Sequence, residues 1–436
     1  MKGRNTLATL FCLTLALLAG LGLHAQQKDN HFSLSARVKS RGELRAGGFK
    51  PDTLDNQRLS HFIIGSYRLT ADYQRSWLEL RISAQQAGVW GEDSDMLGIY
   101  EAYAKLKTKN GWFLKVGRQE LNYDDQRIIG NDDWSMTAPT HDVLKLGYEG
   151  PSHKLHLLFA YNQNDQDMDN GNSYYSGGIQ PHKSMQTFWY HYDTPKSLFG
   201  ISLLGMNIGM QSKDSATTYY QQLVGTYMTL RPKNWVLEGS FYYQMGKEEH
   251  GIPLDAFMGS LRLTVNPKDN YSLYSGYDYL SGDKYFIVPE KGEIGSFNVI
   301  KHDKLMGFSS IYGSHHKFYG AMEFFYVNTH VNGFSPGLQN LFVGGIFNPT
   351  QKLSIEGAYH YLATATSVKK HKRGLGHEIE LTLSYDIAKD INLSAGYSFM
   401  YGSKTMEYLQ HVNENRRLHW AWLMIAFTPT VFSADF

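Results

Sequence analysis

The 436-residue sequence has a single cysteine, Cys12. This residue lies in an N-terminal segment that begins with basic residues, continues with an apolar run from about Leu7 to Leu23, and reaches Ala25 before polar residues. That order is typical of a cleaved secretory signal, so we expect residues 1–25 to be removed after Sec-type export. The exported chain would then have no cysteine, which excludes disulfides, thiol catalysis and cysteine metal sites.

An excess of charge and a long apolar run are also missing. The chain has 42 Lys and Arg against 41 Asp and Glu. Removing the signal takes two positive charges, so the formal net charge changes from +1 to −1, which gives no reason to expect nucleic acid as a partner. Beyond the signal, the longest apolar stretches are LFVGGIF (341–347) and WAWLMIAF (420–427). Both are well short of the roughly 20 residues that a membrane helix needs.

Aromatic residues and glycine are abundant, with 30 Tyr, 23 Phe, 8 Trp and 42 Gly against only 12 Pro. Apolar and polar residues alternate in segments such as SWLELRISA (76–84), IYEAYAKLK (99–107) and HEIELTLSYDI (377–387). Successive strand residues point to opposite faces, so each segment is a predicted strand with one apolar and one ionic face. The segments have about the length of a tilted membrane-spanning strand and carry Tyr and Trp at their ends, as expected at a membrane interface.

The connections between these segments alternate in length. Short turns such as TKNG (108–111) and RPKN (231–234) are followed by longer polar stretches, which include 164–185, 247–254, 282–303, 364–374 and 404–415. Short periplasmic turns and long extracellular loops are typical of outer-membrane barrels, and only helices and closed barrels satisfy every backbone group in lipid. We therefore predict an all-β, transmembrane antiparallel β-barrel that forms one domain over residues 26–436. Counting segments gives about twenty strands to within two, the last of them ending at Pro429.

A strongly charged stretch, GRQELNYDDQRIIGNDDW (117–134), directly follows the predicted strand WFLKV (112–116). Strict alternation would turn Arg118 toward lipid, so we expect a bulge at Gly117 and Arg118, or a position above the membrane plane. In either case we predict a charged network at the pore mouth, where rings of charge set selectivity. The network comprises Arg118, Asp124, Asp125 and Arg127, with Glu79, Arg81, Glu101 and Lys105 from neighbouring strands.

This stretch, followed by THDVLKLGYEG (140–150), resembles the signature region of the alginate-export outer-membrane proteins. The segments GLQNLFVGG (337–345), LGHEIELTLSYDI (375–387) and INLSAGYSFMYG (391–402) resemble later strands of that family. The resemblance implies an eighteen-stranded monomeric barrel and passive export of an acidic polysaccharide such as alginate through an electropositive constriction. It also places Arg118, Gln119, Asp125, Gln126 and Arg127 in the pore block.

Two classes of function remain open. One is an outer-membrane porin for a polar or anionic solute, with no chemistry performed. The other is a barrel with a loop-borne hydrolase or glycan-binding site at 121–142, where five aspartates cluster. Neither a nucleophile elbow nor a His-Glu zinc motif is present, so we expect no enzyme and no cofactor.

Three further motifs fall outside this network. DQDMDNG (165–171) gives Asp165, Asp167 and Asp169 calcium-loop spacing, but it lacks the glycine at the sixth position and the glutamate at the twelfth, so a solvated loop is preferred. The basic run VKKHKR (368–373) is either plain charged surface or a site that recruits an anionic glycan or lipopolysaccharide. His315 and His316, in YGSHHKF, are expected in a tight periplasmic turn.

Overall fold

The computed structural model describes residues 30–46, 59–92, 97–163, 175, 177–178, 180–212, 216–283, 303–323, 335–368, 371–410 and 417–436. Nineteen strands are present in these residues. They are β1 (His31–Ala46), β2 (Leu59–Gln74), β3 (Leu78–Val89), β4 (Leu97–Lys107), β5 (Trp112–Gln119), β6 (His141–Glu149), β7 (His153–Tyr161), β8 (Ser184–Asp193), β9 (Phe199–Gln211), β10 (Thr218–Leu230), β11 (Trp235–Lys247), β12 (Pro253–Lys268), β13 (Tyr271–Leu280), β14 (Leu338–Thr350), β15 (Leu353–Ala363), β16 (Gly374–Ala388), β17 (Ile391–Gly402), β18 (Arg417–Phe427) and β19 (Thr430–Asp435).

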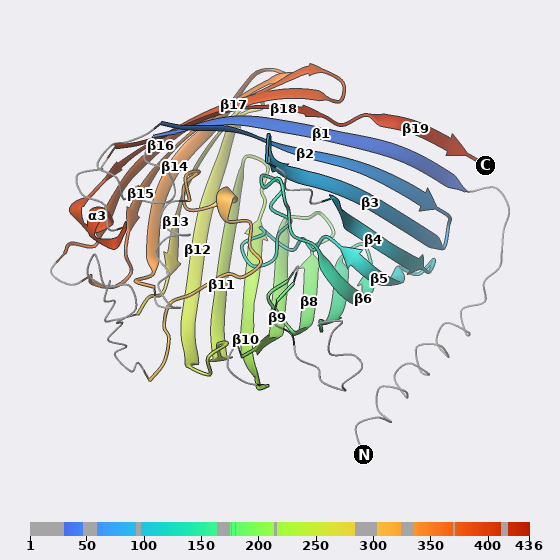
Figure 1. Ribbon diagram of the computed structural model, residues 1–436, viewed down its shortest axis with the longest axis horizontal. Helices are drawn as coiled ribbons and strands as arrows, with labels where there is room; N and C mark the ends of the chain where they lie inside the picture. Colours follow the sequence, from blue (N-terminus) through green and yellow to red (C-terminus); the bar gives the residue numbers. More distant parts are fainter. Residues whose placement is uncertain are drawn as a thin grey trace.

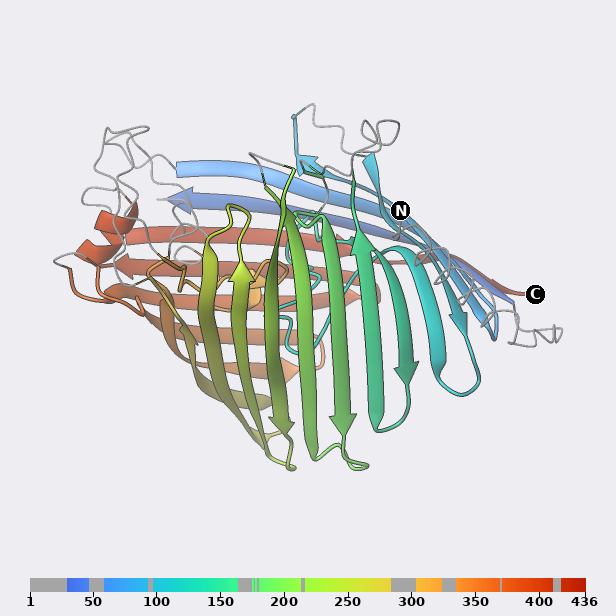
Figure 2. The same cartoon turned by 90° about the horizontal axis from the view of Figure 1, so that it is seen from below.

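The strands close into one antiparallel barrel, as Figures 1 and 2 show. Each strand from β1 to β17 pairs with the next in the chain, and β1 pairs with β2 along one edge. Along its other edge, β1 pairs first with β18, from Ala46 to Val38, and then with β19, from Ser35 to His31. β18 and β19 are therefore two halves of one strand, and the barrel has eighteen. The predicted fold class is confirmed.

Two details of the sequence interpretation were wrong. Pro429 does not end the final strand, because its carbonyl accepts a hydrogen bond from Ala36 and the ladder resumes in β19. His315 and His316 do not form a periplasmic turn between two strands. They lie in a short 3-10 helix, η2 (His315–Lys317), inside the barrel, within the long connection between β13 and β14.

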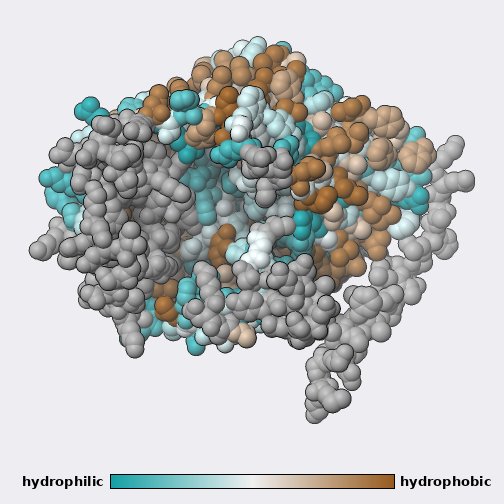
Figure 3. Space-filling view, viewed as in Figure 1, coloured by the Kyte–Doolittle hydropathy of each residue, from teal (hydrophilic) through white to brown (hydrophobic). Residues whose placement is uncertain are grey.

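The two faces of each strand differ as the alternation predicted. On β3, Leu80 and Ile82 are exposed on the outer face, whereas Ser83 is buried on the inner face. Leu381 on β16 and Leu423 on β18 are likewise exposed. Figure 3 shows hydrophobic residues gathered over the upper and right-hand parts of the molecule, around a hydrophilic hollow near the centre of the view. The outer face therefore presents apolar side chains to the membrane.

Connections are short at one end of the barrel and long at the other. At the short end, β12 and β13 are separated by two residues, 269–270, and β14 and β15 by 351–352. Both chain ends of the barrel, His31 on β1 and Asp435 on β19, lie at this short-turn end. One short helix, α3 (Lys404–Gln410), lies at the long-loop end. Among the described residues, no helix is long and apolar enough to span a bilayer.

Two long connections fold into the barrel, and we call them the first inner loop (120–140) and the second inner loop (303–323). Figures 1 and 2 show both within the ring of strands. They meet where Ile129 forms a parallel bridge with Tyr312. Leu121 and Phe308 are each 1% exposed, because they pack into one apolar cluster with inward side chains of the wall. The interior therefore has a core of its own, and that core fixes the polar groups described next.

Candidate functional site

Arg127 joins the first inner loop to the second inner loop and to the barrel wall. Its guanidinium lies 2.9 Å from Asp125 and 2.8 Å from Asp278 of β13, and it stacks 3.9 Å above the ring of Phe318. With 4% of its surface exposed, Arg127 is buried in this contact. Sequence reasoning placed it in a charged network at or in the pore mouth, and the structure shows an internal clamp in which Arg127 pairs with Asp125 and with the distant Asp278.

The residues before Arg127 form a tightly bent turn. Asp124 and Gln126 both have positive φ angles, 52° and 75°. The indole of Trp189 donates to Asp124 at 3.1 Å, and the carbonyl of Gln126 accepts from the backbone of Ser314 at 2.9 Å. Burial raises the pKa of Asp124 and of Asp125 above the usual aspartate range. The turn is thus held to β8 through Asp124 and to the second inner loop through Gln126.

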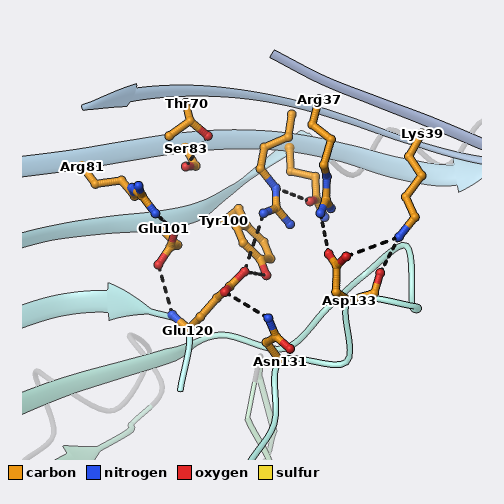
Figure 4. Close-up of polar contacts among 12 residues, drawn as sticks. Arg37, Lys39, Thr70, Arg81, Ser83, Tyr100, Glu101, Glu120, Asn131 and Asp133 are labelled. Carbon is orange, nitrogen blue, oxygen red and sulfur yellow. Dashed lines mark hydrogen bonds and ion pairs between the residues drawn. The ribbon is translucent and has the colours of Figure 1, made fainter. Parts of the chain in front are cut away.

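The first inner loop is bound to a basic part of the wall, as Figure 4 shows. Asp133 accepts from Arg37 at 2.6 Å, and the amine of Lys39 donates to its backbone carbonyl. Glu120 lies 3.6 Å from Arg68 of β2 and accepts from the hydroxyl of Tyr100. Loop carboxylates thus cover part of a cationic surface on β1 and β2.

The second inner loop is bound to an acidic part of the wall. On β16, the carboxylate of Glu378 accepts from the backbone of Met322 at 2.9 Å, and that of Glu380 accepts from Ala321 at 2.6 Å. Glu378 is 1% exposed. The interior therefore has cations opposite anions, with a loop docked on each.

Trp134 and His316 form the contact between the inner loops near β1. The two rings stack with centroids 4.2 Å apart, and Arg41 covers Trp134 at 3.9 Å. Both faces of the indole are therefore occupied. Beside this stack is a cavity of about 400 Å³, which Arg45 and Trp420 also line. A second cavity, of about 290 Å³, is lined by Lys317, Arg262 and Glu238.

Arg118 does not face the lumen. It pairs in register with Asp142 of β6, and its guanidinium contacts that carboxylate at 2.9 and 2.7 Å. It has the same orientation as Val116, which is exposed on the outer face. The β4–β5 and β5–β6 registers run through Gly117 and Arg118 without a shift, so no bulge is present. Alternation therefore holds, and Asp142 neutralises the outward arginine.

The other predicted residues lie on the inner face. Gln119 is fully buried, and its amide donates to the carbonyls of Gly117 and Val143. The remaining four form contacts among neighbouring strands: Arg81 contacts Glu101 at 3.2 Å, and Lys105 lies 4.0 Å from Glu79. Their inward position agrees with the period-two pattern, but none of them contacts Arg127.

Sequence reasoning missed the cations of β1 and β2. Arg37, Lys39, Arg41 and Arg45 all point inward from β1, and Arg68 lies opposite Arg37 in the β1–β2 register. The signal was present in RVKSRGELR (37–45), where every second residue is charged and all but Glu43 are basic.

The five aspartates of 121–142 do not converge on one point. Asp125 contacts Arg127, Asp133 contacts Arg37, and Asp142 faces outward beside Arg118. The described residues contain no group of three or more side chains that could hold a metal ion. Asp165, Asp167 and Asp169, the calcium candidates, lie outside the described residues.

Comparison with solved structures supports the fold. The crystal structure of OccK9 (OpdG) from Pseudomonas aeruginosa matches with a TM-score of 0.59 at 14% identity, covering 91% of this chain and 98% of that one. OccK2 (OpdF) from the same organism, solved in complex with glucuronate, matches with a TM-score of 0.60 at 14% identity over 92% and 98%. OpdK with vanillate matches with a TM-score of 0.57 at 12% identity over 92% and 99%. No curated protein sequence matches the chain.

The closed eighteen-stranded barrel with an apolar outer face and a polar interior defines a porin-like protein of the outer membrane. A family model described as alginate export matches residues 78–401, which is more than half of the chain. The chain belongs to the alginate export family.

Proposed function

We propose that this protein is a monomeric, passive channel for an anionic solute that carries carboxylate groups, of which an acidic polysaccharide is the leading candidate. The proposal rests on the distribution of charge inside the barrel. Inward cations follow one another from the long-loop end of β1 to the short-turn end of β6. They are Arg45, Arg41, Lys39, Arg37, Arg68, Arg81, Lys105, Lys115 and Lys145. Inward carboxylates on the same strands, Glu43, Asp72, Glu79 and Glu101, pair with Arg41, Arg45, Arg81 and Lys105, so the cations are in excess without being alone.

The observation that carries the proposal is a row of three lysines. Lys105, Lys115 and Lys145 lie side by side in register on β4, β5 and β6. Like charges directly opposite one another on a sheet are destabilising. Within the described part of the chain, Lys115 and Lys145 have no carboxylate partner. Their amines instead lie over Tyr103 at 3.6 Å and Tyr123 at 5.1 Å. Such a row destabilises the fold, and it can attract an anion that passes through the lumen.

Arg37 and Arg68 form a second place where two like charges face each other across neighbouring strands. They are directly opposite one another, and three of their guanidinium nitrogens are buried without a hydrogen-bond partner, Nε and Nη2 of Arg37 and Nη2 of Arg68. The carboxylates that do reach them belong to Asp133 and Glu120 of the first inner loop. Planar guanidinium groups match carboxylates well, so a solute carboxylate fits the same surface.

The opposite wall carries the complementary charge. Glu238, Asp278, Glu356 and Glu378 all face inward from β11 to β16. Charges of opposite sign across a narrow, low-dielectric interior set up a field that keeps an anion near the cationic side. The similar barrel OccK2 has been solved with glucuronate and OpdK with vanillate, and both molecules carry a carboxylate. Flow through such a channel follows the solute gradient.

The test is single-channel recording of the full-length protein in a planar bilayer, with oligoglucuronate added to one side. We expect block by oligoglucuronate and none by an uncharged oligosaccharide of the same length. Replacing Lys115→Gln and Lys145→Gln should weaken the block about five-fold per lysine, because two charges about 4 Å apart in water interact by about 1 kcal/mol. Lys109→Gln, in the exposed turn at 108–111, is the matched control. Equal block by the neutral sugar would overturn the proposal.

A further inference from the structure

Outside the lumen, we propose that the outward rim of β16–β18 binds the phosphorylated headgroup of an outer-leaflet glycolipid such as lipopolysaccharide. The rim patch consists of His377, Tyr401, Arg417 and His419. This site requires only that the barrel lies in the outer membrane. It is independent of which solute the lumen passes.

The register places these residues side by side. His377 of β16 lies opposite Tyr401 of β17, which lies opposite Arg417 of β18. Neighbouring strands are about 4.8 Å apart, so His377 and Arg417 are separated by about 10 Å. His419 follows two residues after Arg417, about 7 Å along the same face. The patch is therefore wide enough for a phosphate group and the sugar that carries it.

The patch lies on the membrane-facing surface at the long-loop end. Ile379, two residues after His377, and Leu423, four residues after His419, have the same orientation and are 55% and 56% exposed. β18 begins at Arg417 and β16 begins three residues before His377. The patch thus lies directly above the apolar belt, where the headgroups of the outer leaflet are found.

The patch offers hydrogen-bond donors. The hydroxyl of Tyr359 lies 2.6 Å from Nδ1 of His377, and that of Tyr397 lies 2.8 Å from Nδ1 of His419. When the hydroxyl donates to Nδ1, the ring proton is on Nε2, which then points to the surroundings as a donor. Arg417 is exposed, and its guanidinium contacts no carboxylate in the described residues. Two equivalent Tyr–His pairs and a guanidinium beside them suit a phosphate.

Two further cations adjoin the patch in the basic run before β16. Lys372 and Arg373 are exposed, and their segment is held against α3. The hydroxyl of Thr405 donates to the carbonyl of Lys372 at 2.6 Å, and the rings of His371 and Tyr408 stack at 4.5 Å. Each Lys or Arg near an anionic membrane surface contributes about 1 kcal/mol of attraction. The segment therefore adds positive charge at a fixed position.

The acidic side chains next to the rim patch on β16 do not neutralise its positive charge. Glu378 and Glu380 of β16 face the interior and bind the second inner loop. Elsewhere on the outer face the situation differs, since Arg118 is neutralised by two contacts with Asp142. The rim patch keeps its charge available, which favours an anionic lipid over a plain hydrocarbon contact.

The experiment is native mass spectrometry of the purified full-length protein with hexa-acylated, bisphosphorylated lipid A, compared with the same lipid after dephosphorylation. We expect phosphate-dependent binding. The triple variant Arg417→Gln, His377→Gln, His419→Gln should weaken it at least five-fold, which is the loss expected from Arg417 alone at about 1 kcal/mol per cation. Glutamine retains a partner for each tyrosine. Arg75→Gln, at the short-turn end, is the matched control and should bind as the parent protein does.

Three results would overturn the proposal: equal binding of the dephosphorylated lipid, unchanged binding by the triple variant, or an equal loss in Arg75→Gln. Channel conductance separates this site from the lumen, because the triple variant should conduct as the parent protein does. If the parent protein binds lipid A but shows no block by oligoglucuronate, the proposed solute is wrong and the lipid site stands.

Discussion

Arg127 shows how one side chain fixes the interior of this barrel. A buried guanidinium that contacts Asp125, Asp278 and the ring of Phe318 connects both inner loops to β13. The sequence predicts that Arg127 belongs to a charged network. It does not show that Arg127 clamps the inner loops, because Asp278 and Phe318 are more than 150 positions away. Local spacing cannot show which distant carboxylate an arginine meets.

Removing this clamp should be costly. Arg127→Gln leaves Asp278 and Asp125 buried without their cation, and breaking a buried ion pair typically costs about 3–5 kcal/mol. We expect a loss of this size in the free energy of unfolding or of inner-loop docking, measured by denaturant titration in detergent. Arg231→Gln removes a more exposed contact with Asp193 and should cost about 1 kcal/mol or less. Similar losses in both variants would contradict the clamp.

Asp132 gives a prediction about pH. Burial and the nearby Glu323 raise the pKa of Asp132 above the usual aspartate range. Because the folded form then holds the proton more tightly, docking of the first inner loop is favoured at low pH and weakens as the pH rises through the raised pKa. Asp132→Asn should stabilise the protein at pH 7 and have little effect at pH 3, as followed by thermal unfolding. Asparagine also tolerates the positive φ of 41° found here.

The control for this pH effect is the neighbouring aspartate. Asp133→Asn removes the contact with Arg37, so it should not stabilise the protein at pH 7. If Asp132→Asn instead lowers the stability at pH 7, the ionised Asp132 makes favourable contacts that outweigh the cost of burying its charge.

At the scale of elements, the strands were predictable and the inner loops were not. SWLELRISA, IYEAYAKLK and HEIELTLSYDI coincide with β3, β4 and β16, because one apolar face in lipid enforces strict alternation. The second inner loop has no such signal. It is buried against the first inner loop and the wall, so its conformation depends on contacts that are distant in sequence. The prediction that the final strand ends at Pro429 was also wrong, because β1 pairs with the chain on both sides of this proline.

The contact between the inner loops can be tested at Gly313. A Cβ atom added there would lie 2.2 Å from the backbone carbonyl oxygen of Arg127 and 2.6 Å from the hydroxyl of Ser310. Overpacking of this kind typically costs about 1–3 kcal/mol. Gly313→Ala should separate the inner loops and make them sensitive to added protease while the barrel persists. Gly42→Ala, where nothing lies within 4 Å, is the control. Equal protection in both variants would show that the inner loops are not tightly docked.

At the scale of the whole molecule, a nearly neutral chain is strongly polarised inside. The formal net charge of +1 conceals an excess of cations over carboxylates on the inner faces of β1–β6 and several carboxylates on those of β11–β16. The net charge therefore gave no sign of an anionic solute, whereas the arrangement of the charges favours one. The sequence contained the alternating basic residues of β1, but the registers of the pairings from β1 to β6 decide how they lie relative to Lys115 and Lys145.

The most direct test of this account is the reversal potential of single channels formed by the full-length protein in a tenfold KCl gradient. We predict a preference for chloride over potassium that falls when Arg37→Gln and Arg68→Gln are combined, and falls again with Lys115→Gln and Lys145→Gln. Lys109→Gln should change nothing. A cation preference in the parent protein, or a selectivity indifferent to all four substitutions, would contradict the claim that the cationic wall of β1–β6 carries the solute.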